Sequence, residues 1–163
     1  MMEGAVVTMS SMLTLRPAVA RDERRVLEWR NEPSTRLWSL TNREISPDDH
    51  HVWFTRKLAD PGCILLIVED DGRPVGQLRL DRTAPDSAEV SIGLAPEARG
   101  RGLGREALRL AAGLAVRDFG VVTLVAKIKR GNTASLKTFG AAGYEEESEE
   151  GGIAELRLVV GRA

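Results

Sequence analysis

The chain has 163 residues, of which 42% are hydrophobic and 29% charged, the composition of a globular domain rather than of a disordered or fibrous chain. With 23 Lys and Arg against 24 Asp and Glu, the net charge is −1, which argues against a protein that coats nucleic acid. A single cysteine, Cys63, excludes an internal disulfide, and two histidines without a cysteine cluster disfavour a structural zinc site.

The length of the chain and its first residues limit the possible domain organisation and location. The chain is long enough for one domain with a proper core and too short for two comfortable ones. Residues 1–11 lack the basic segment and apolar core of a secretory signal, and no apolar run is long enough to span a membrane. We therefore expect a disordered tail over 1–11, a single domain over 12–163, a cytoplasmic location and no membrane partner.

The first part of the chain predicts a strand and two helices. Residues 12–18 are typical of a strand, and residues 20–31 of a short amphipathic helix that ends before Pro33. Ser46 is suited to cap a second helix, which we expect over 47–60.

The rest of the chain predicts a three-stranded meander followed by alternating helices and strands. Meander strands pair antiparallel, whereas a strand–helix–strand unit requires a parallel crossover. The predicted fold class is therefore α/β (α+β), a single-domain, mixed, mostly antiparallel sheet of about six to seven strands flanked by about four helices. The expected elements are strands 63–70, 74–81 and 87–94, helix 103–119, strand 121–128, helix 132–143 and, after an acidic hairpin, strand 151–160.

The stretch Arg-Gly-Arg-Gly-Leu-Gly at 99–104 places glycines and arginines directly before a predicted helix. Three interpretations are open: a flexible turn, a dinucleotide fingerprint, and a pyrophosphate site built from main-chain amides at the helix N-terminus. The fingerprint is disfavoured because residues 96–99 separate its glycines from the preceding strand, and because the next strand ends in basic residues instead of an acidic one. A Walker loop is excluded, since no Lys-Ser/Thr follows the glycines.

These residues carry a resemblance to a known family. The stretch 99–104 fits the Q/R-x-x-G-x-G/A signature of the GNAT acetyltransferases, in which such a loop binds the pyrophosphate of acetyl-CoA. Downstream, Asn132-Thr133-Ala134-Ser135 and then Gly143-Tyr144 resemble the family's second motif, N-x-x-A/S followed by Gly-Phe. The resemblance covers about residues 12 to 160, nearly the whole chain.

The resemblance implies acetyl-CoA as co-substrate, no metal, and a sheet whose fourth and fifth strands splay apart to admit the pantetheine arm. Asn132 also has a local interpretation as the N-cap of the helix that follows it. The implied cofactor-binding residues are Ile92, Gly93 and Leu94 on the fourth strand, Arg99, Gly100, Arg101, Gly102, Leu103, Gly104 and Arg105 in the loop, and Asn132 and Ser135 in the second motif.

Glu89 is the candidate general base. An amine is largely protonated at pH 7, so a base raises the reactive fraction. Glu89 occupies a polar position of strand 87–94, where several resembling enzymes have their base; the alternative is a solvent-facing strand glutamate. Many resembling enzymes have a tyrosine acid seven residues after the motif asparagine, but Phe139 stands there, and Tyr144 occupies the Gly-Phe position. We therefore assign no general acid.

The first two helices supply the acceptor site in the resembling enzymes. Here they carry Trp29, Arg30 and Asn31, and then His50 and Trp53. The combination resembles the branch that acetylates nucleotide-linked amino sugars, as in pseudaminic acid biosynthesis: an arginine can bind a phosphate, and a tryptophan can stack on a base or sugar. The alternative is structural, with both tryptophans in the core and His50 a capping or surface residue.

Other functions stay open at this point. A related branch acetylates protein N-termini, including those of ribosomal proteins, or polyamines. Two non-enzymatic alternatives are a CoA-binding sensor without catalysis and a scaffold whose loop binds nothing. As partners we expect a small-molecule amine acceptor and no nucleic acid, and a homodimer is compatible with the resemblance.

Overall fold

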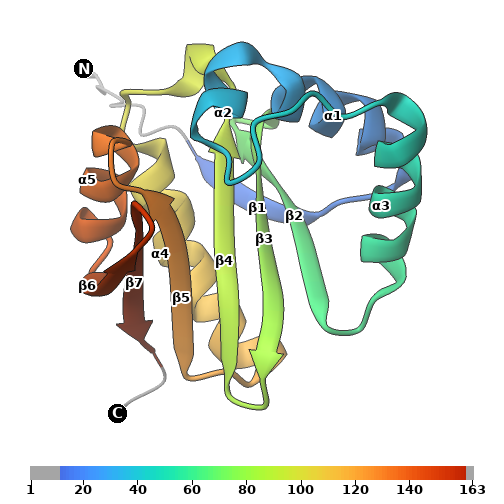
Figure 1. Cartoon of the computed structure of the whole chain (residues 1–163). Coiled ribbons are helices and arrows are strands. Elements are labelled where there is room, and N and C mark those ends of the chain that lie inside the picture. Colours follow the sequence, from blue (N-terminus) through green and yellow to red (C-terminus); the bar gives the residue numbers. More distant parts are fainter. Residues whose placement is uncertain (1–11, 161–163) are drawn as a thin grey trace, which may run out of the picture.

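The computed structural model describes residues 12–160, so the predicted tail over 1–11 lies outside the described residues. One seven-stranded sheet runs in the order β1-β2-β3-β4-β5-β7-β6 (Figure 1). Every neighbouring pair is antiparallel except β4 and β5, which are parallel, and this confirms the predicted mixed sheet. The strands are β1 Leu13–Pro17, β2 Cys63–Asp70, β3 Arg73–Ala84, β4 Ser87–Leu94, β5 Thr123–Lys129, β6 Glu145–Glu150 and β7 Ile153–Val159.

Five α-helices flank the sheet within residues 12–160, where about four were expected. The additional helix begins at Pro33, which the sequence suggested only as a terminator. Proline fits the first turn of a helix because its missing N–H has no partner there in any case. The Glu32 side chain caps this helix by accepting from the Thr35 amide at 3.0 Å. The helices are α1 Glu23–Asn31, α2 Pro33–Trp38, α3 Pro47–Ala59, α4 Leu103–Leu114 and α5 Thr133–Ala141.

The sheet has an apolar core on each face. On β2, Leu66 and Val68 belong to the larger core with α4 and α5, whereas Leu65 and Ile67 face the smaller core with α1 and α3. Because successive strand residues point to opposite faces, a strand buried on both sides reads as a continuous apolar run. Within residues 12–160, no helix combines the length and the hydropathy needed to cross a bilayer.

Strands β4 and β5 pair over only a short stretch. Residues 87–89 of β4 lie opposite residues 123–125 of β5, and beyond them each strand continues only with its other neighbour, β3 or β7. Figure 1 shows the two strands close together at one end and apart at the end where α2 lies. The predicted splay is therefore present, and it leaves the last residues of β4 without a partner on the β5 side.

The long helix after the glycine loop changes its geometry before it ends. The α-helical part stops at Leu114, and one π-helical turn, Ala115–Phe119, completes the span predicted from the sequence. Gly120 closes the turn with φ of 67°, a left-handed conformation that glycine adopts without a Cβ penalty.

Candidate active site

The glycine loop before α4 presents unpaired main-chain amides. Gly100 and Gly102 have φ of 75° and 79°, and a Cβ at either position would meet no described atom within 4 Å. The amides of residues 100–105 donate no hydrogen bond to any acceptor within residues 12–160. Consecutive free N–H groups at the positive end of a 12-residue helix attract an anion, and a Cβ-free surface lets it approach closely.

The three loop arginines differ in their contacts. Arg99 donates from Nε to the Leu94 carbonyl at 3.2 Å, and its other nitrogens bind α2. Arg101 donates from Nη2 to Asp70 Oδ2 at 2.8 Å. Arg105 is exposed and forms no ion pair within the described chain. The sequence predicted phosphate contacts from all three, and the structure engages two of them with protein groups.

The buried Asp70 carboxylate holds the glycine loop in place through its ion pair with Arg101. Its side chain is 4% exposed, and its second oxygen, Oδ1, is buried without a partner among the described residues. We therefore expect Arg101→Met to lower the free energy of unfolding by about 1–3 kcal/mol, because it leaves a buried carboxylate unpaired. For a chain of this size, each kcal/mol corresponds to about 2–4 °C in Tm.

Thermal denaturation measures this effect, and Arg105→Met is the matched control because it removes an exposed arginine from the same loop. Equal melting temperatures for the two variants would show that the Asp70 ion pair contributes nothing to stability.

The end of β4 lies very close to β3. Gly76 pairs with Leu94, and a Cβ on Gly76 would lie 2.5 Å from the Gly93 carbonyl oxygen, so only glycine fits there. The predicted pantetheine-binding residues Ile92, Gly93 and Leu94 are half-buried, and a short turn over residues 95–98 connects them to the glycine loop. A Cβ on Gly93 would meet nothing within 4 Å, which leaves space for a ligand on that side. No sequence pattern indicates this role of Gly76.

The second motif begins α5. The Asn132 side chain accepts from the Ser135 amide at 3.2 Å and forms the N-cap that the local sequence predicted. α5 also packs against the start of α4, since a Cβ on Gly104 would lie 3.0 Å from the Thr138 methyl carbon. The motif residues are thus placed beside the helix that the glycine loop begins, and their contact with CoA stays a prediction.

Glu89 lies where β4 and β5 still pair. It stands opposite Asp81 of β3 and Val125 of β5, on the face that carries α1 and α3, and its side chain is 32% exposed. The Lys127 Nζ lies 3.9 Å from Glu89 Oε1. Lys127 is a residue that sequence reasoning missed, although the alternation of β5 puts it on this face. Glu89 lies about 13 Å of strand from Gly93, so a base at this position would need water to reach an amine bound beside Gly93.

Phe139 and Tyr144 pack together in the larger core. Their rings meet edge to face with centroids 5.0 Å apart, and Tyr144 is 4% exposed. Burial raises the pKa of Tyr144, and its hydroxyl has no partner within the described residues. A buried phenol with a raised pKa does not protonate a thiolate at the surface, so neither residue supplies the missing acid.

Two of the predicted acceptor residues hold the loop over residues 39–46. Asn31 Nδ2 donates to the Ile45 carbonyl, and the Ile45 amide donates to Asn31 Oδ1, both at 2.8 Å. Arg30 Nη2 donates to the Thr41 carbonyl at 2.8 Å, while its Nη1 is buried without a partner among the described atoms. These side chains fix the conformation of that loop, and their contact with an acceptor stays a prediction.

The other three acceptor candidates lie against the smaller core. Trp29 and Trp53 pack on it, and the Arg79 guanidinium lies 5.2 Å from the centroid of the Trp53 ring. His50 is 2% exposed and stacks on Phe54, with ring centroids 5.7 Å apart. Burial lowers the pKa of His50, which keeps the imidazole neutral at pH 7. The structure thus places His50 and Trp53 side by side on α3, with ring centroids 5.5 Å apart, and packs both tryptophans against the smaller core.

A charged cluster borders the same face. The Asp81 carboxylate accepts from Lys57 Nζ at 2.7 Å and from Arg79 Nε at 2.6 Å. Burial, together with Asp81, raises the pKa of Cys63 to about 12, so this thiol stays protonated. Within residues 12–160, no three metal-ligating side chains are grouped closely enough to hold an ion.

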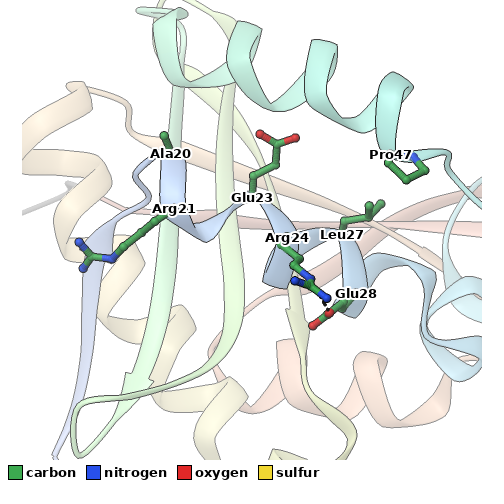
Figure 2. A pocket seen from close by; sticks show the side chains of 7 residues that line it. All are labelled: Ala20, Arg21, Glu23, Arg24, Leu27, Glu28 and Pro47. Carbon is green, nitrogen blue, oxygen red and sulfur yellow. Dashed lines mark ion pairs between the residues drawn. The ribbon is translucent and has the colours of Figure 1, made fainter.

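The surface hollow shown in Figure 2 lies elsewhere. It has a volume of about 520 Å³ and is lined by side chains from Ala20 to Glu28 and by Pro47. None of these seven residues belongs to the predicted site, and Arg24 and Glu28 pair across part of it. The site is therefore defined by the glycine loop and the splayed strands, an arrangement typical of enzymes that bind a phosphorylated co-substrate.

Comparisons with known proteins agree with this class. The family described as "Acetyltransferase (GNAT) domain" matches residues 12–145. The chain is 32% identical over 155 residues, 88% of its length and 91% of the relative's, to YwnH of Bacillus subtilis (strain 168), provisionally named a phosphinothricin acetyltransferase. This chain therefore belongs to the GNAT acetyltransferases, a family of enzymes that take their acetyl group from acetyl-CoA.

Solved structures show the same fold. Spermidine N-acetyltransferase from Vibrio cholerae, in complex with CoA and spermine, superposes with a TM-score of 0.83 at 19% identity, over 91% of this chain and 95% of that one. A structure provisionally described as a phosphinothricin N-acetyltransferase superposes with a TM-score of 0.78 at 26% identity, over 93% of this chain and 100% of the other.

Proposed function

We propose that this chain transfers the acetyl group of acetyl-CoA to the primary amine of a small molecule that carries an anionic group, with Glu89 as general base. The observation that carries the proposal is the run of free amides over residues 100–105, at the open end of the β4–β5 splay. A diphosphate accepted there directs the pantetheine arm along Ile92, Gly93 and Leu94. The sequence also favours a cytoplasmic location for this reaction.

Glu89 suits the proton transfer for two reasons. Its carboxylate is partly exposed, so water can connect it to an amine bound further along β4. The Lys127 ammonium lies 3.9 Å from this carboxylate, and the ion pair helps to hold the side chain between β4 and β5. The departing CoA thiol has an ordinary thiol pKa of about 8.5, so it can leave as a thiolate without an acid from the protein.

The charges on the acceptor side favour an anionic substrate. Burial lowers the pKa of Arg30, and so do the positive charges of three neighbouring arginines: Arg36, Arg79 and Arg43. Such a group of guanidinium ions attracts phosphate or carboxylate. Nucleotide-linked amino sugars, the acceptors suggested by the sequence, carry a diphosphate and a base that can stack on Trp53.

A second acceptor class is an amino acid with an additional acidic group. The provisional names of the Bacillus relative and of one structural neighbour favour it, because phosphinothricin combines an amine with anionic groups. A polyamine fits this chain less well than an anionic amine does. The opposed carboxylates of Asp81 and Glu89 both face cations already, which leaves little negative charge for a polyamine.

An activity screen tests the proposal. The full chain, acetyl-CoA and a thiol reagent are combined with a UDP-linked amino sugar, phosphinothricin, a peptide with a free N-terminus, and spermidine. We expect kcat/KM for an anionic amine to exceed that for spermidine by about tenfold or more, and the KM to rise with salt. Fastest turnover of spermidine would contradict the anionic acceptor, and CoA binding without thiol release from any amine would favour the non-catalytic sensor.

A further inference from the structure

Helix α2 spans the end of the β4–β5 splay. At its N-terminus it meets Arg99, whose Nε also binds the carbonyl of Leu94, the last residue of β4. At its C-terminus, the Lys129 ammonium at the end of β5 donates to the Leu37 carbonyl at 3.1 Å. Figure 1 shows α2 at this end of the two strands. The helix is thus attached to both strands between which the pantetheine arm is proposed to lie.

The attachment to the glycine loop depends on one guanidinium group. Arg99 Nη1 donates to Ser34 Oγ at 2.6 Å and Nη2 donates to Thr35 Oγ1 at 2.9 Å, with Glu32 Oε1 at 3.5 Å. The Ser34 hydroxyl in turn donates to Glu32, which also accepts from the Thr35 amide. The side chains that cap α2 are therefore the same ones that hold Arg99.

The pKa of Glu32 supports this arrangement. The hydrogen bond from Ser34 and those from the start of α2 lower it to about 2, so the carboxylate is ionised at any working pH. An ionised carboxylate beside a guanidinium keeps that guanidinium in place, because charge-assisted hydrogen bonds are stronger than neutral ones. Arg99 would lose all four of these contacts if it turned toward a phosphate.

We propose that Arg99 is a positioning residue that couples occupation of the glycine loop to the placement of α2 beside the acceptor, and that it is not a ligand of the pyrophosphate. The inference rests on the proposed binding of acetyl-CoA by this loop. Main-chain amides over residues 100–105 provide the phosphate contacts. The Arg99 side chain, directly before them, transmits a change in the loop conformation to α2 through its hydrogen bonds. An acceptor amine then meets an α2 that is held more firmly in place when the co-substrate is bound.

Hydrogen exchange of α2 with and without CoA tests the coupling. In the wild-type protein, saturating CoA should slow exchange of the peptide covering 33–38 by about threefold or more. In Arg99→Met we expect faster exchange of this peptide, no further slowing by CoA, and a calorimetric Kd for CoA within about threefold of the wild type. Arg109→Met, which removes an exposed arginine from α4, should behave as the wild type does in both measurements.

A second variant separates the contact from any defect in the loop. Ser34→Ala combined with Thr35→Val removes the acceptors of Arg99 from the α2 side, and it should abolish the CoA-dependent slowing as Arg99→Met does. A rise of tenfold or more in the Kd for CoA in Arg99→Met, with the α2 response intact, would identify Arg99 as a phosphate ligand and overturn the proposal. Failure of the wild-type protein to bind CoA would instead contradict the proposed function.

Discussion

Replacing Glu89 by glutamine should lower kcat by about 10²–10⁴-fold while leaving the KM for acetyl-CoA nearly unchanged. Glutamine preserves the shape of the side chain and removes its ability to accept a proton. The residual activity should increase with pH, because the fraction of neutral amine then rises without help from the protein. Steady-state kinetics between pH 6 and about 10, with the best acceptor from the activity screen, measure both effects.

Glu155→Gln is the matched control for this experiment. Glu155 lies on β7 opposite Lys127, on the same face of the sheet as Glu89. The substitution therefore changes the local charge by the same amount without touching the proposed base. A similar kcat for the two variants would show that the glutamate at position 89 has only an electrostatic or structural role.

The sheet was predictable because its pattern is local. The β2 and β4 strands begin and end where the apolar run and the alternation predict, and Ser46 caps α3 as expected. Helix α2 was not predictable in the same way. Its six residues show no amphipathic period, and a proline was sufficient to suggest an end rather than a beginning. Its capping residue, Glu32, also lies beside Arg99, a contact between residues far apart in sequence that no local pattern indicates.

The candidate site shows the same difference between local features, which the sequence predicts, and contacts between distant residues, which it does not. The phosphate-binding loop is a continuous stretch of sequence, so glycine spacing before a helix was sufficient to predict it. The partners of its arginines are remote in sequence: Asp70 lies 31 residues from Arg101, and Ser34 lies 65 residues from Arg99. No spacing rule connects such pairs, because the sheet order that brings them together is set by packing. The sequence therefore predicted a cofactor contact for each arginine and missed the side-chain contacts that Arg99 and Arg101 make within the protein.

Gly102→Ala should weaken CoA binding about 5–30-fold with only a small effect on the fold. A residue with a Cβ is destabilised by about 1–2 kcal/mol at the φ of 79° found here. The free loop relaxes to avoid that strain, so CoA binding must restore it, and each 1.4 kcal/mol corresponds to a factor of ten in Kd. A Cβ here would meet no described protein atom within 4 Å, so no repacking adds to the effect. Isothermal titration calorimetry with CoA measures the change.

Gly120→Ala supplies the control for backbone strain. Gly120 has φ of 67°, and a Cβ there would also meet nothing within 4 Å, but the residue follows the far end of the α4 helix. Gly120→Ala should therefore lose thermal stability and keep its affinity for CoA, while Gly102→Ala loses affinity. Equal CoA affinities in the two variants would mean that the left-handed glycine loop does not form the diphosphate site, because a ligand held by the amides of residues 100–105 must sense the conformation of the residue in their middle.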